Sequence, residues 1–407
     1  MARRAADAVN AEFVMRLAQR LVQIRSVVEP DRGATEAAAA EFVAETLREL
    51  GLEPTLEEAA PNRPNVICDW AGSSFEQGNH KTLLLEGHSD VVTEGDAADW
   101  KHSPFAGIVE NGALYGRGSA DMKGGVAAAI GALAALQTAV PDLPGRVRLG
   151  VVVDEEGLML GIKHFIRQGH ADELDGAIIC EPEENELCLF QKGAMRVSVM
   201  FRGKMAHGAM PYAGVNPVAA LGKFLEDVRA LEASEQRRLG RHEHLGFPWF
   251  TPTTVRAPDR GEAQHNVMPA AAYLALDIRT VPGQEHGRLL DKLNVMASDL
   301  MRETAGLSIT LDCFESRPWT ETPGSDPLVS ALEAAYPLVF DRAPRYGGVP
   351  GATDGTFLHA LKSVPIVTVG PGDRDIPHQL DEFVHLDEVV AAARLYAAAA
   401  VYFFDEE

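Results

Sequence analysis

The stretch Thr-Leu-Leu-Leu-Glu-Gly-His-Ser-Asp at residues 82–90 joins a short apolar run to a group of polar side chains. Apolar residues that follow one another without alternation are typical of a strand buried on both faces. Similar runs occur at 147–153, 177–180 and 365–369. Helical patterns lie between these runs, for example at 122–137. This succession predicts an α/β fold with a mostly parallel sheet that is covered by helices.

The pattern changes between about residues 192 and 303. Apolar and polar residues alternate at 195–202 and again at 273–279. Such alternation is typical of antiparallel strands with one buried and one exposed face. We therefore expect a large α/β domain made of residues 1–191 and 304–407, with a smaller α+β domain inserted at residues 192–303.

The composition excludes several classes of protein. The chain has 407 residues and a net charge of -22, and such a charge repels nucleic acid and anionic membranes. Its four cysteines form no Cys-x-x-Cys pair, which indicates neither a disulfide framework nor a cysteine metal site. No run approaches the ~20 apolar residues that a membrane span requires. No signal-peptide core follows the N-terminal arginines. We therefore expect a cytoplasmic protein.

Acidic and imidazole side chains follow the apolar runs. Because an open α/β sheet binds its ligands beyond the carboxyl ends of its strands, these side chains should meet at one edge. A further acidic residue opens the helical pattern near residue 122. In chain order these candidates are His88, Asp90, Asp121, Glu155, Glu156, Glu181 and His378.

Several carboxylates at one place would repel one another unless cations neutralised them. Two imidazoles with several carboxylates suit Zn²⁺, Co²⁺ or Mn²⁺, and the lack of cysteine ligands disfavours a closed structural zinc site. A bridging carboxylate would hold two ions roughly 3.5–4 Å apart. Each residue taken singly has a structural explanation, and Gly116-x-Gly118 is a weak phosphate-loop signal. The hypothesis of a metal site therefore rests on the occurrence of all these acidic and imidazole residues at the ends of predicted strands.

At these residues the chain resembles the M20 metallopeptidase family, which includes acetylornithine deacetylase, succinyl-diaminopimelate desuccinylase, aminoacylase and carboxypeptidase G2. The matching motifs run almost from end to end. They are Gly-His88-Ser-Asp90-Val-Val, Gly-Arg-Gly-Ser-Ala-Asp121-Met-Lys-Gly-Gly, Asp-Glu155-Glu156-Gly, Glu181-Pro, Met-Ala-His207-Gly-Ala-Met-Pro, His265-Asn266-Val-Met-Pro, Gly351-Ala-Thr-Asp354-Gly and His378-Gln-Leu-Asp-Glu.

The resemblance implies a zinc-dependent exopeptidase-like catalytic domain that binds two divalent ions. Zinc is the expected metal, with cobalt or manganese as alternatives. His88, Asp121 and Glu181 would hold one ion, and Asp121, Glu156 and His378 the other. Asp90 would accept the second ring N–H of His88. Glu155 would be the general base that takes a proton from the bridging water and later delivers it to the leaving amine.

The resemblance also implies that the inserted domain forms a homodimer and closes over the site. His207 would then reach the active site of the other subunit and stabilise the oxyanion. Asn266 and Arg279 match positions that contact the substrate, and Gly351 and Thr353 lie in a loop that is similar to a substrate-carboxylate loop. At Thr356 some relatives carry arginine, so the carboxylate contact of those relatives is not fully matched.

The leading hypothesis is hydrolysis of the amide bond of a small N-acyl amino acid. The same motifs also suit a dipeptidase or aminopeptidase, or a hydrolase of another C–N bond such as that of an aromatic amine. A two-metal phosphoesterase would need more cationic residues than Arg117 and Lys123 within these motifs. A non-catalytic small-molecule binder is the alternative outside enzymes.

Overall fold

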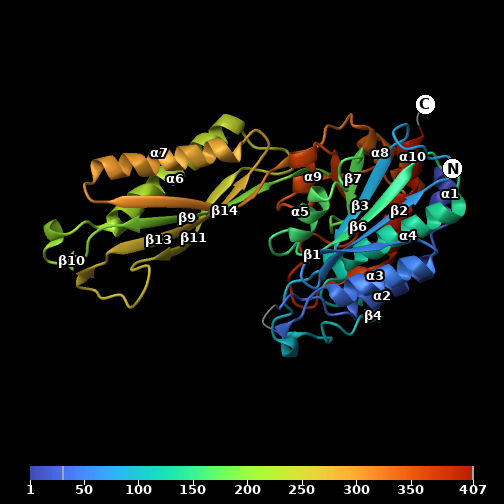
Figure 1. Cartoon of the computed structure of the whole chain (residues 1–407), viewed down its shortest axis with the longest axis horizontal. Coiled ribbons are helices and arrows are strands. Elements are labelled where there is room, and N and C mark those ends of the chain that lie inside the picture. The colour runs from blue at the N-terminus through green and yellow to red at the C-terminus, as the bar shows by residue number, and fades with distance from the viewer. Residues whose placement is uncertain (30–31, 406–407) are drawn as a thin grey trace. The chain divides into compact units, whose positions relative to one another are not determined.

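A computed structural model of the chain describes residues 1–29 and 32–405. These residues divide into two compact units (Figure 1). Unit 1 comprises Met1–Phe190, Glu321–Val349 and Thr353–Glu407, and unit 2 comprises Gln191–Thr320 and Pro350–Ala352.

Unit 1 is built on a large mixed sheet. Its strands lie in the order β1 (Thr55–Ala60), β2 (Arg63–Ala71), β6 (Arg146–Val152), β3 (Thr82–His88), β7 (Gly176–Ile179), β17 (Ile366–Thr368), β8 (Leu187–Gln191) and β15 (Thr320–Glu321), and β16 (Tyr346–Val349) pairs with β8. The central strands β6, β3, β7 and β17 are parallel neighbours. The pairs β1–β2, β2–β6 and β8–β17 are antiparallel.

Helices cover both faces of this sheet. They are α1 (Ala2–Asp7), α2 (Ala11–Val22), α3 (Ala37–Glu49), α4 (Gly124–Ala139), α5 (Leu160–Arg167), α8 (Pro327–Val339), α9 (Gly355–Lys362) and α10 (Leu386–Phe404). Leu83 and Leu85 of β3 pack in the core cluster that includes α4 and α10, whereas Leu84 packs with Phe165 of α5 and Phe357 of α9. The strand is therefore buried on both faces, and each such side chain contributes about 1.5–3 kcal/mol of transfer free energy.

The predicted α/β class with a helix-covered sheet is confirmed, and the parallel pairs are concentrated at its centre. Within the described residues, no helix combines the length and apolar character that crossing a membrane requires. Short elements complete unit 1. They are η2 (Ala97–Asp99), η3 (Ser119–Lys123) and a small sheet of β4 (Ile108–Glu110), β5 (Ala113–Tyr115) and β18 (Phe383–His385).

Unit 2 carries an antiparallel sheet in the order β11 (Trp249–Arg256), β13 (Ala271–Thr280), β9 (Gly193–Arg202) and β14 (Ser308–Arg317). Helices α6 (Pro217–Leu239) and α7 (His286–Glu303) pack on one face of it, in one core cluster with its apolar side chains. The pair β10 (Ala206–His207) and β12 (Val267–Met268) and the turn η4 (Pro211–Ala213) complete the unit.

The extent of unit 2 differs from the expected 192–303. Strand β14 begins at Ser308 and pairs along its length with β9, from Ser308 opposite Arg202 to Arg317 opposite Ala194. This pairing makes β14 an edge strand of the smaller sheet, and unit 2 therefore continues to Thr320. The alternation in β9 follows the expected pattern, because Met195, Val197 and Val199 are buried in the core under α6 and α7.

Acidification is expected to destabilise unit 2 through His286, which lies at the start of α7. Its Nε2 is 2.8 Å from Thr280 Oγ1 and its Nδ1 is 2.8 Å from Ser316 Oγ. Burial lowers the pKa of His286 to about 4. The unfolded chain, in which a histidine has a pKa of about 6.5, therefore binds this proton first. The free energy of unfolding should fall as pH drops from about 6.5 to 4, by at most about 3 kcal/mol.

Hydrogen exchange at the β13 and β14 amides, followed from pH 7 to 4, measures this effect. A His286→Gln variant should lose most of this pH dependence, whereas His265→Gln, at an exposed position of the same unit, should keep it. An unchanged pH profile in the His286→Gln protein would show that another group governs the acid response.

Candidate active site and metal centre

The carboxyl ends of the central parallel strands bring together most of the predicted metal ligands and Glu155. His88 is the last residue of β3 and pairs with Val152, the last residue of β6. The loop after β6 carries Glu155 and Glu156, and Glu181 follows β7 two residues after its end. Because these strands are parallel neighbours, their ends meet at one edge of the sheet.

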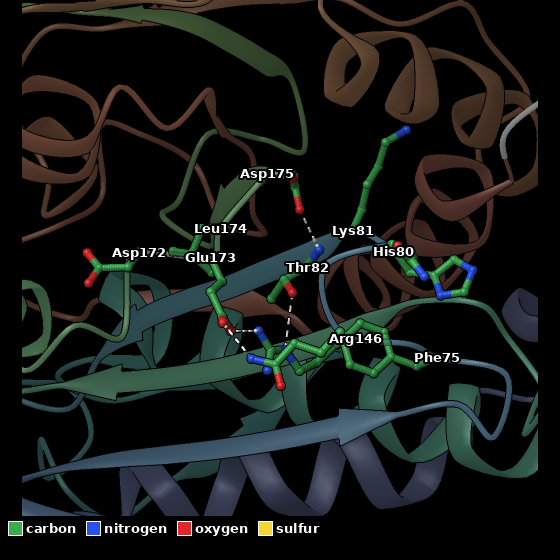
Figure 2. A pocket seen from close by; sticks show the side chains of 12 residues that line it. Phe75, His80, Lys81, Thr82, Arg146, Asp172, Glu173, Leu174 and Asp175 are labelled. Carbon is green, nitrogen blue, oxygen red and sulfur yellow. Dashed lines mark hydrogen bonds and ion pairs between the residues drawn. The ribbon is translucent and has the colours of Figure 1, made fainter.

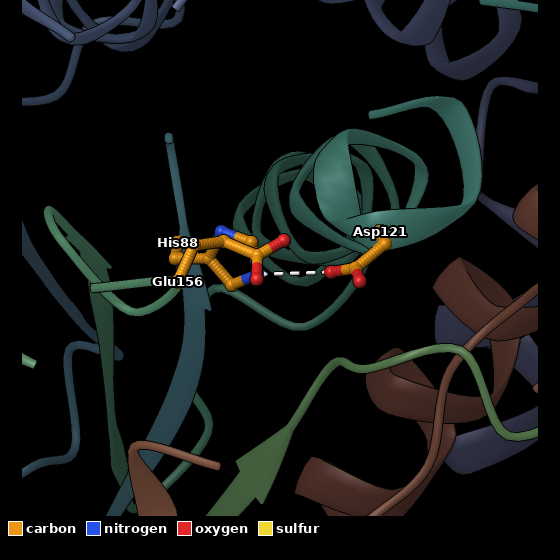
Figure 3. A group of neighbouring side chains, drawn as sticks. All are labelled: His88, Asp121 and Glu156. Atoms are coloured by element: carbon orange, nitrogen blue, oxygen red, sulfur yellow. Dashed lines mark hydrogen bonds and ion pairs between the residues drawn. The ribbon is translucent and has the colours of Figure 1, made fainter. Parts of the chain in front are cut away.

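Asp121 lies between the two histidines. Its Oδ1 is 3.0 Å from His88 Nε2, and its Oδ2 is 3.4 Å from His378 Nε2. Figure 3 shows His88, Asp121 and Glu156 pointing toward one another from the end of β3, from the segment before α4 and from the loop after β6. A carboxylate that offers one oxygen to each side has the arrangement of a bridging ligand.

The remaining two carboxylates each lie beside one histidine. Glu181 Oε1 is 3.6 Å from His88 Nε2, and Glu156 Oε1 is 2.9 Å from His378 Nε2. By these pairwise contacts, Asp121 is shared between a group around His88 and a group around His378. Potential ligand atoms of His88, Asp121 and Glu156 lie within 4.8 Å of one another, and so do those of His88, Glu155 and Glu181. These two sets of three, whose atoms are mutually close, both include His88.

The carboxylate of Asp90 contacts the loop that carries Glu155. Its Oδ1 accepts the N–H of Glu155 and its Oδ2 accepts the N–H of Glu156, both at 3.1 Å. His88 Nδ1 lies 3.0 Å from the Asp90 backbone carbonyl oxygen and 3.6 Å from the carboxylate. The ring contact expected of the Asp90 carboxylate is therefore made more closely by its main chain. The side chain itself holds Glu155 and Glu156 in place.

The electrostatics of the cluster favour a cation. Burial raises the pKa of Glu155 well above its usual range, His88 opposes this shift, and Asp354, Glu156 and Asp121 add to it. Burial and Asp121 likewise raise the pKa of Glu181. Such shifts mean that adjacent buried carboxylates destabilise one another in their charged forms.

The donor set also fits divalent metals. Hydrogen bonds that the His378 ring donates to the carboxylates of Asp121 and Glu156 raise the pKa of His378 to about 10. Cations bound among these carboxylates would relieve their repulsion and replace the imidazolium protons. Two imidazoles with oxygen donors suit Zn²⁺, Co²⁺ or Mn²⁺. The residues present therefore fit a two-metal centre.

One acidic residue near this cluster was not among the predicted site residues. Glu86 is buried, 2% exposed, and burial raises its pKa to about 8, with His88 opposing and Glu155 adding to the shift. Its position two residues before His88 in a strand places both side chains on the same face. That spacing is the signal in the sequence that could have identified it.

Two further predicted residues lie in the loop after β16. Thr353 of unit 1 is buried, and its Oγ1 accepts the N–H of Gly355. Gly351 belongs to the short segment Pro350–Ala352, which is grouped with unit 2.

The other three predicted residues lie within unit 2. His207 is exposed and pairs with Val267 across β10 and β12, and the adjacent Gly208 N–H donates to the Asn266 carbonyl oxygen. His207 and Asn266 are thus neighbours. Arg279 pairs with Asp277, with 2.7 Å between Nε and Oδ1. An arginine already neutralised in this way would have to exchange its partner to bind a substrate carboxylate.

A separate pocket of about 500 Å³ opens at the opposite edge of the sheet (Figure 2). Thr82 and Arg146, the first residues of β3 and β6, line it. Arg146 pairs with Glu173, and the Thr82 N–H donates to Asp175. The pocket thus lies at the amino ends of β3 and β6, whereas the metal-ligand candidates lie at their carboxyl ends.

Comparisons with known proteins identify a family and relatives of this chain. The family model described as peptidase family M20/M25/M40 matches residues 84–402. A succinyl-diaminopimelate desuccinylase from Halorhodospira halophila is 29% identical over 406 residues, covering 96% of this chain and 96% of the relative. A probable succinyl-diaminopimelate desuccinylase from Staphylococcus epidermidis is 26% identical over 382 residues, covering 89% and 91%.

Solved structures share the fold. The aminopeptidase PepT from Bacillus cereus matches with a TM-score of 0.77 at 18% identity, over 97% of this chain and 99% of that chain. The YXEP protein of Bacillus subtilis, described as a dinuclear metal binding peptidase, matches with a TM-score of 0.70 at 16% identity, over 97% and 98%. At these identities the likeness concerns the fold.

Proposed function

The chain belongs to the M20/M25/M40 peptidase family, and we propose that it hydrolyses the amide bond of a small N-acyl amino acid or a related compound at a two-metal centre. The observation that carries this proposal is the position of Asp121 between His88 and His378, with one carboxylate oxygen toward each. The names of the two desuccinylase relatives, which describe removal of an acyl group from an amino acid, support the acyl amino acid as the substrate class.

Two divalent ions, preferably Zn²⁺ with Co²⁺ or Mn²⁺ as alternatives, complete the proposed site. His88 and Glu181 would hold one ion, Glu156 and His378 would hold the other, and Asp121 would be shared between them. When bound, such ions polarise the scissile carbonyl group and lower the pKa of water toward neutrality. An excess of carboxylates over imidazoles makes the site selective for cations before any substrate arrives.

Glu155 is the proposed general base. It is buried, 8% exposed, and it lies in one group with His88 and Glu181. Its carboxylate accepts a proton from the attacking water and donates that proton to the leaving amine. A raised pKa suits both steps, because a general base and acid works best when its pKa lies near the working pH. Asp90 accepts the backbone N–H groups of Glu155 and Glu156 and so orients the carboxylates of these two residues.

Unit 1 is the proposed catalytic domain, and unit 2 is the proposed dimerisation and lid domain of a cytoplasmic homodimer. The exposed His207 would stabilise the oxyanion in the active site of a second copy of the chain. Asn266 beside it and Arg279 would contact the substrate, with Gly351 and Thr353 in the loop after β16. His207 lies on β10 and Asn266 directly precedes the partner strand β12, where its carbonyl oxygen accepts the Gly208 N–H, and this proximity supports a joint role for them.

A side-by-side substrate screen tests the proposal. N-acyl amino acids, dipeptides and N-acylated aromatic amines are offered to the metal-loaded enzyme at equal concentrations, and release of the free amine is measured. The N-acyl amino acids should give the highest kcat/KM. Turnover of dipeptides alone, or of aromatic amides alone, would show that the proposed substrate class is wrong. Such a result would not contradict the proposed metal centre.

A further inference from the structure

The pairing of β5 with β18 brings together two segments that each carry a proposed metal ligand. Phe383 pairs with Tyr115 across these antiparallel strands. Just beyond this pair, the Gly116 N–H donates to the Glu382 carbonyl oxygen over 2.9 Å. One segment continues to Asp121 and the other leads back to His378. The small sheet therefore sets the register between the chain around the bridging carboxylate and the chain around the second histidine.

The Glu382 carboxylate lies at the junction of these segments and is 1% exposed. Its Oε1 accepts the N–H groups of Ala120 at 3.0 Å and Asp121 at 3.1 Å. Its Oε2 accepts a hydrogen bond from Arg117 Nη1 at 2.6 Å. Glu382 thus binds the main chain at Asp121, while the Asp121 carboxylate points toward the two histidines.

Arg117 extends this contact to the second segment. Its guanidinium is 3% exposed and lies 5.0 Å from the centre of the Trp100 ring, while its Nη2 donates to the His378 carbonyl oxygen over 3.4 Å. One buried ion pair is therefore hydrogen-bonded to the backbone of Asp121 on one side and of His378 on the other.

A buried ion pair is a weak source of stability, because removing both charges from water costs about as much as their attraction returns. The pair is better explained by what it positions. On the basis of the two-metal centre proposed above, we infer that Glu382 and Arg117 form a positioning pair that holds the bridging ligand Asp121 and the ligand His378 at the spacing two ions require. Neither residue touches the reacting atoms.

The test compares Zn²⁺ binding by the metal-free wild-type chain and by Glu382→Gln, using competition with a chromogenic chelator at fixed pH. Glutamine keeps the size of the side chain and one acceptor oxygen, but it forms no ion pair with Arg117 and lacks the second acceptor oxygen. We expect the wild-type chain to bind two ions, and the variant to bind at least one of them about 10–100-fold more weakly, as is typical when a group that orients a ligand is removed.

Asp69→Asn provides the matched control for lost stability. Asp69 pairs with Arg148 over 2.6 Å between β2 and β6, outside the ligand cluster. Urea unfolding of the metal-free proteins should show that both variants are less stable than the wild type. Only Glu382→Gln should lose zinc affinity. Equal zinc affinity of Glu382→Gln and the wild type would overturn the inference and leave the pair a purely structural feature.

Arg117→Lys gives a second, independent arm in case Glu382→Gln does not fold. Lysine keeps the positive charge for Glu382 but lacks the second nitrogen that reaches the His378 carbonyl. The variant should bind one of the two Zn²⁺ ions more weakly and the other with wild-type affinity. Unchanged affinity for both ions would contradict the positioning role. A wild-type chain that binds no pair of ions would instead overturn the proposed metal centre itself, so the two failures are distinguishable.

Discussion

Replacement of Glu155 by glutamine should lower kcat by about 10²–10⁴-fold, the contribution of a general base, and leave metal binding intact. This loss corresponds to about 3–5 kcal/mol of transition-state stabilisation. Glutamine keeps the shape of the side chain and the N–H contact to Asp90, but it cannot accept a proton. In this variant, bulk solvent must accept the proton from the attacking water, whereas the residues that bind the substrate and the metal ions are unchanged.

Steady-state turnover and metal content measured on the same preparation check this expectation. Glu156→Gln is the matched neighbour, because it removes a proposed metal ligand one residue away in the same loop. It should lose one ion together with activity, while Glu155→Gln should lose activity alone. Near-wild-type turnover in Glu155→Gln would assign the base to another residue, and metal loss in that variant would make Glu155 a ligand.

Replacement of Asp121 by asparagine should abolish tight binding of the metal pair. The carboxylate is within 3.4 Å of both histidines, and neutralising it removes one anionic donor from each ion at once. The loss of affinity should exceed the roughly 100-fold upper value found for groups that only orient a ligand. Turnover should fall with it.

Isothermal titration of the metal-free proteins with Zn²⁺ measures the effect directly. Asp142→Asn, at an exposed position outside the site, serves as the charge-matched control and should bind like the wild type. Two ions bound to Asp121→Asn with wild-type affinity would rule out a bridging role for this carboxylate.

The end of the sheet that carries the proposed site was predictable from local sequence. Runs such as 82–85 and 147–153 lack alternation because both faces of their strands are buried, and polar residues follow them because strand ends face solvent and ligands. The resemblance to the M20 metallopeptidases, seen in motifs from His88 to His378, is confirmed by a family match over residues 84–402.

Features that depend on long-range pairing could not be predicted in this way. Strand β14 belongs to unit 2 only because it pairs with β9, more than a hundred residues earlier, and its own alternation does not identify that partner. The contact between Glu382 and the Asp121 N–H likewise depends on the register of β5 with β18. The motif around His378 includes Glu382, but a motif does not reveal which atoms its side chain meets.

We propose that hydrolysis requires two ions bound at the His88–Asp121–His378 cluster. The most direct measurement titrates the chelated, metal-free chain with Zn²⁺ and records bound ions per chain and amide hydrolysis on the same samples. We predict no turnover without metal, saturation at two ions per chain, and activity that rises with occupancy. Undiminished hydrolysis by the metal-free chain, or full activity that is independent of added Zn²⁺, Co²⁺ and Mn²⁺, would show that metal ions are not required.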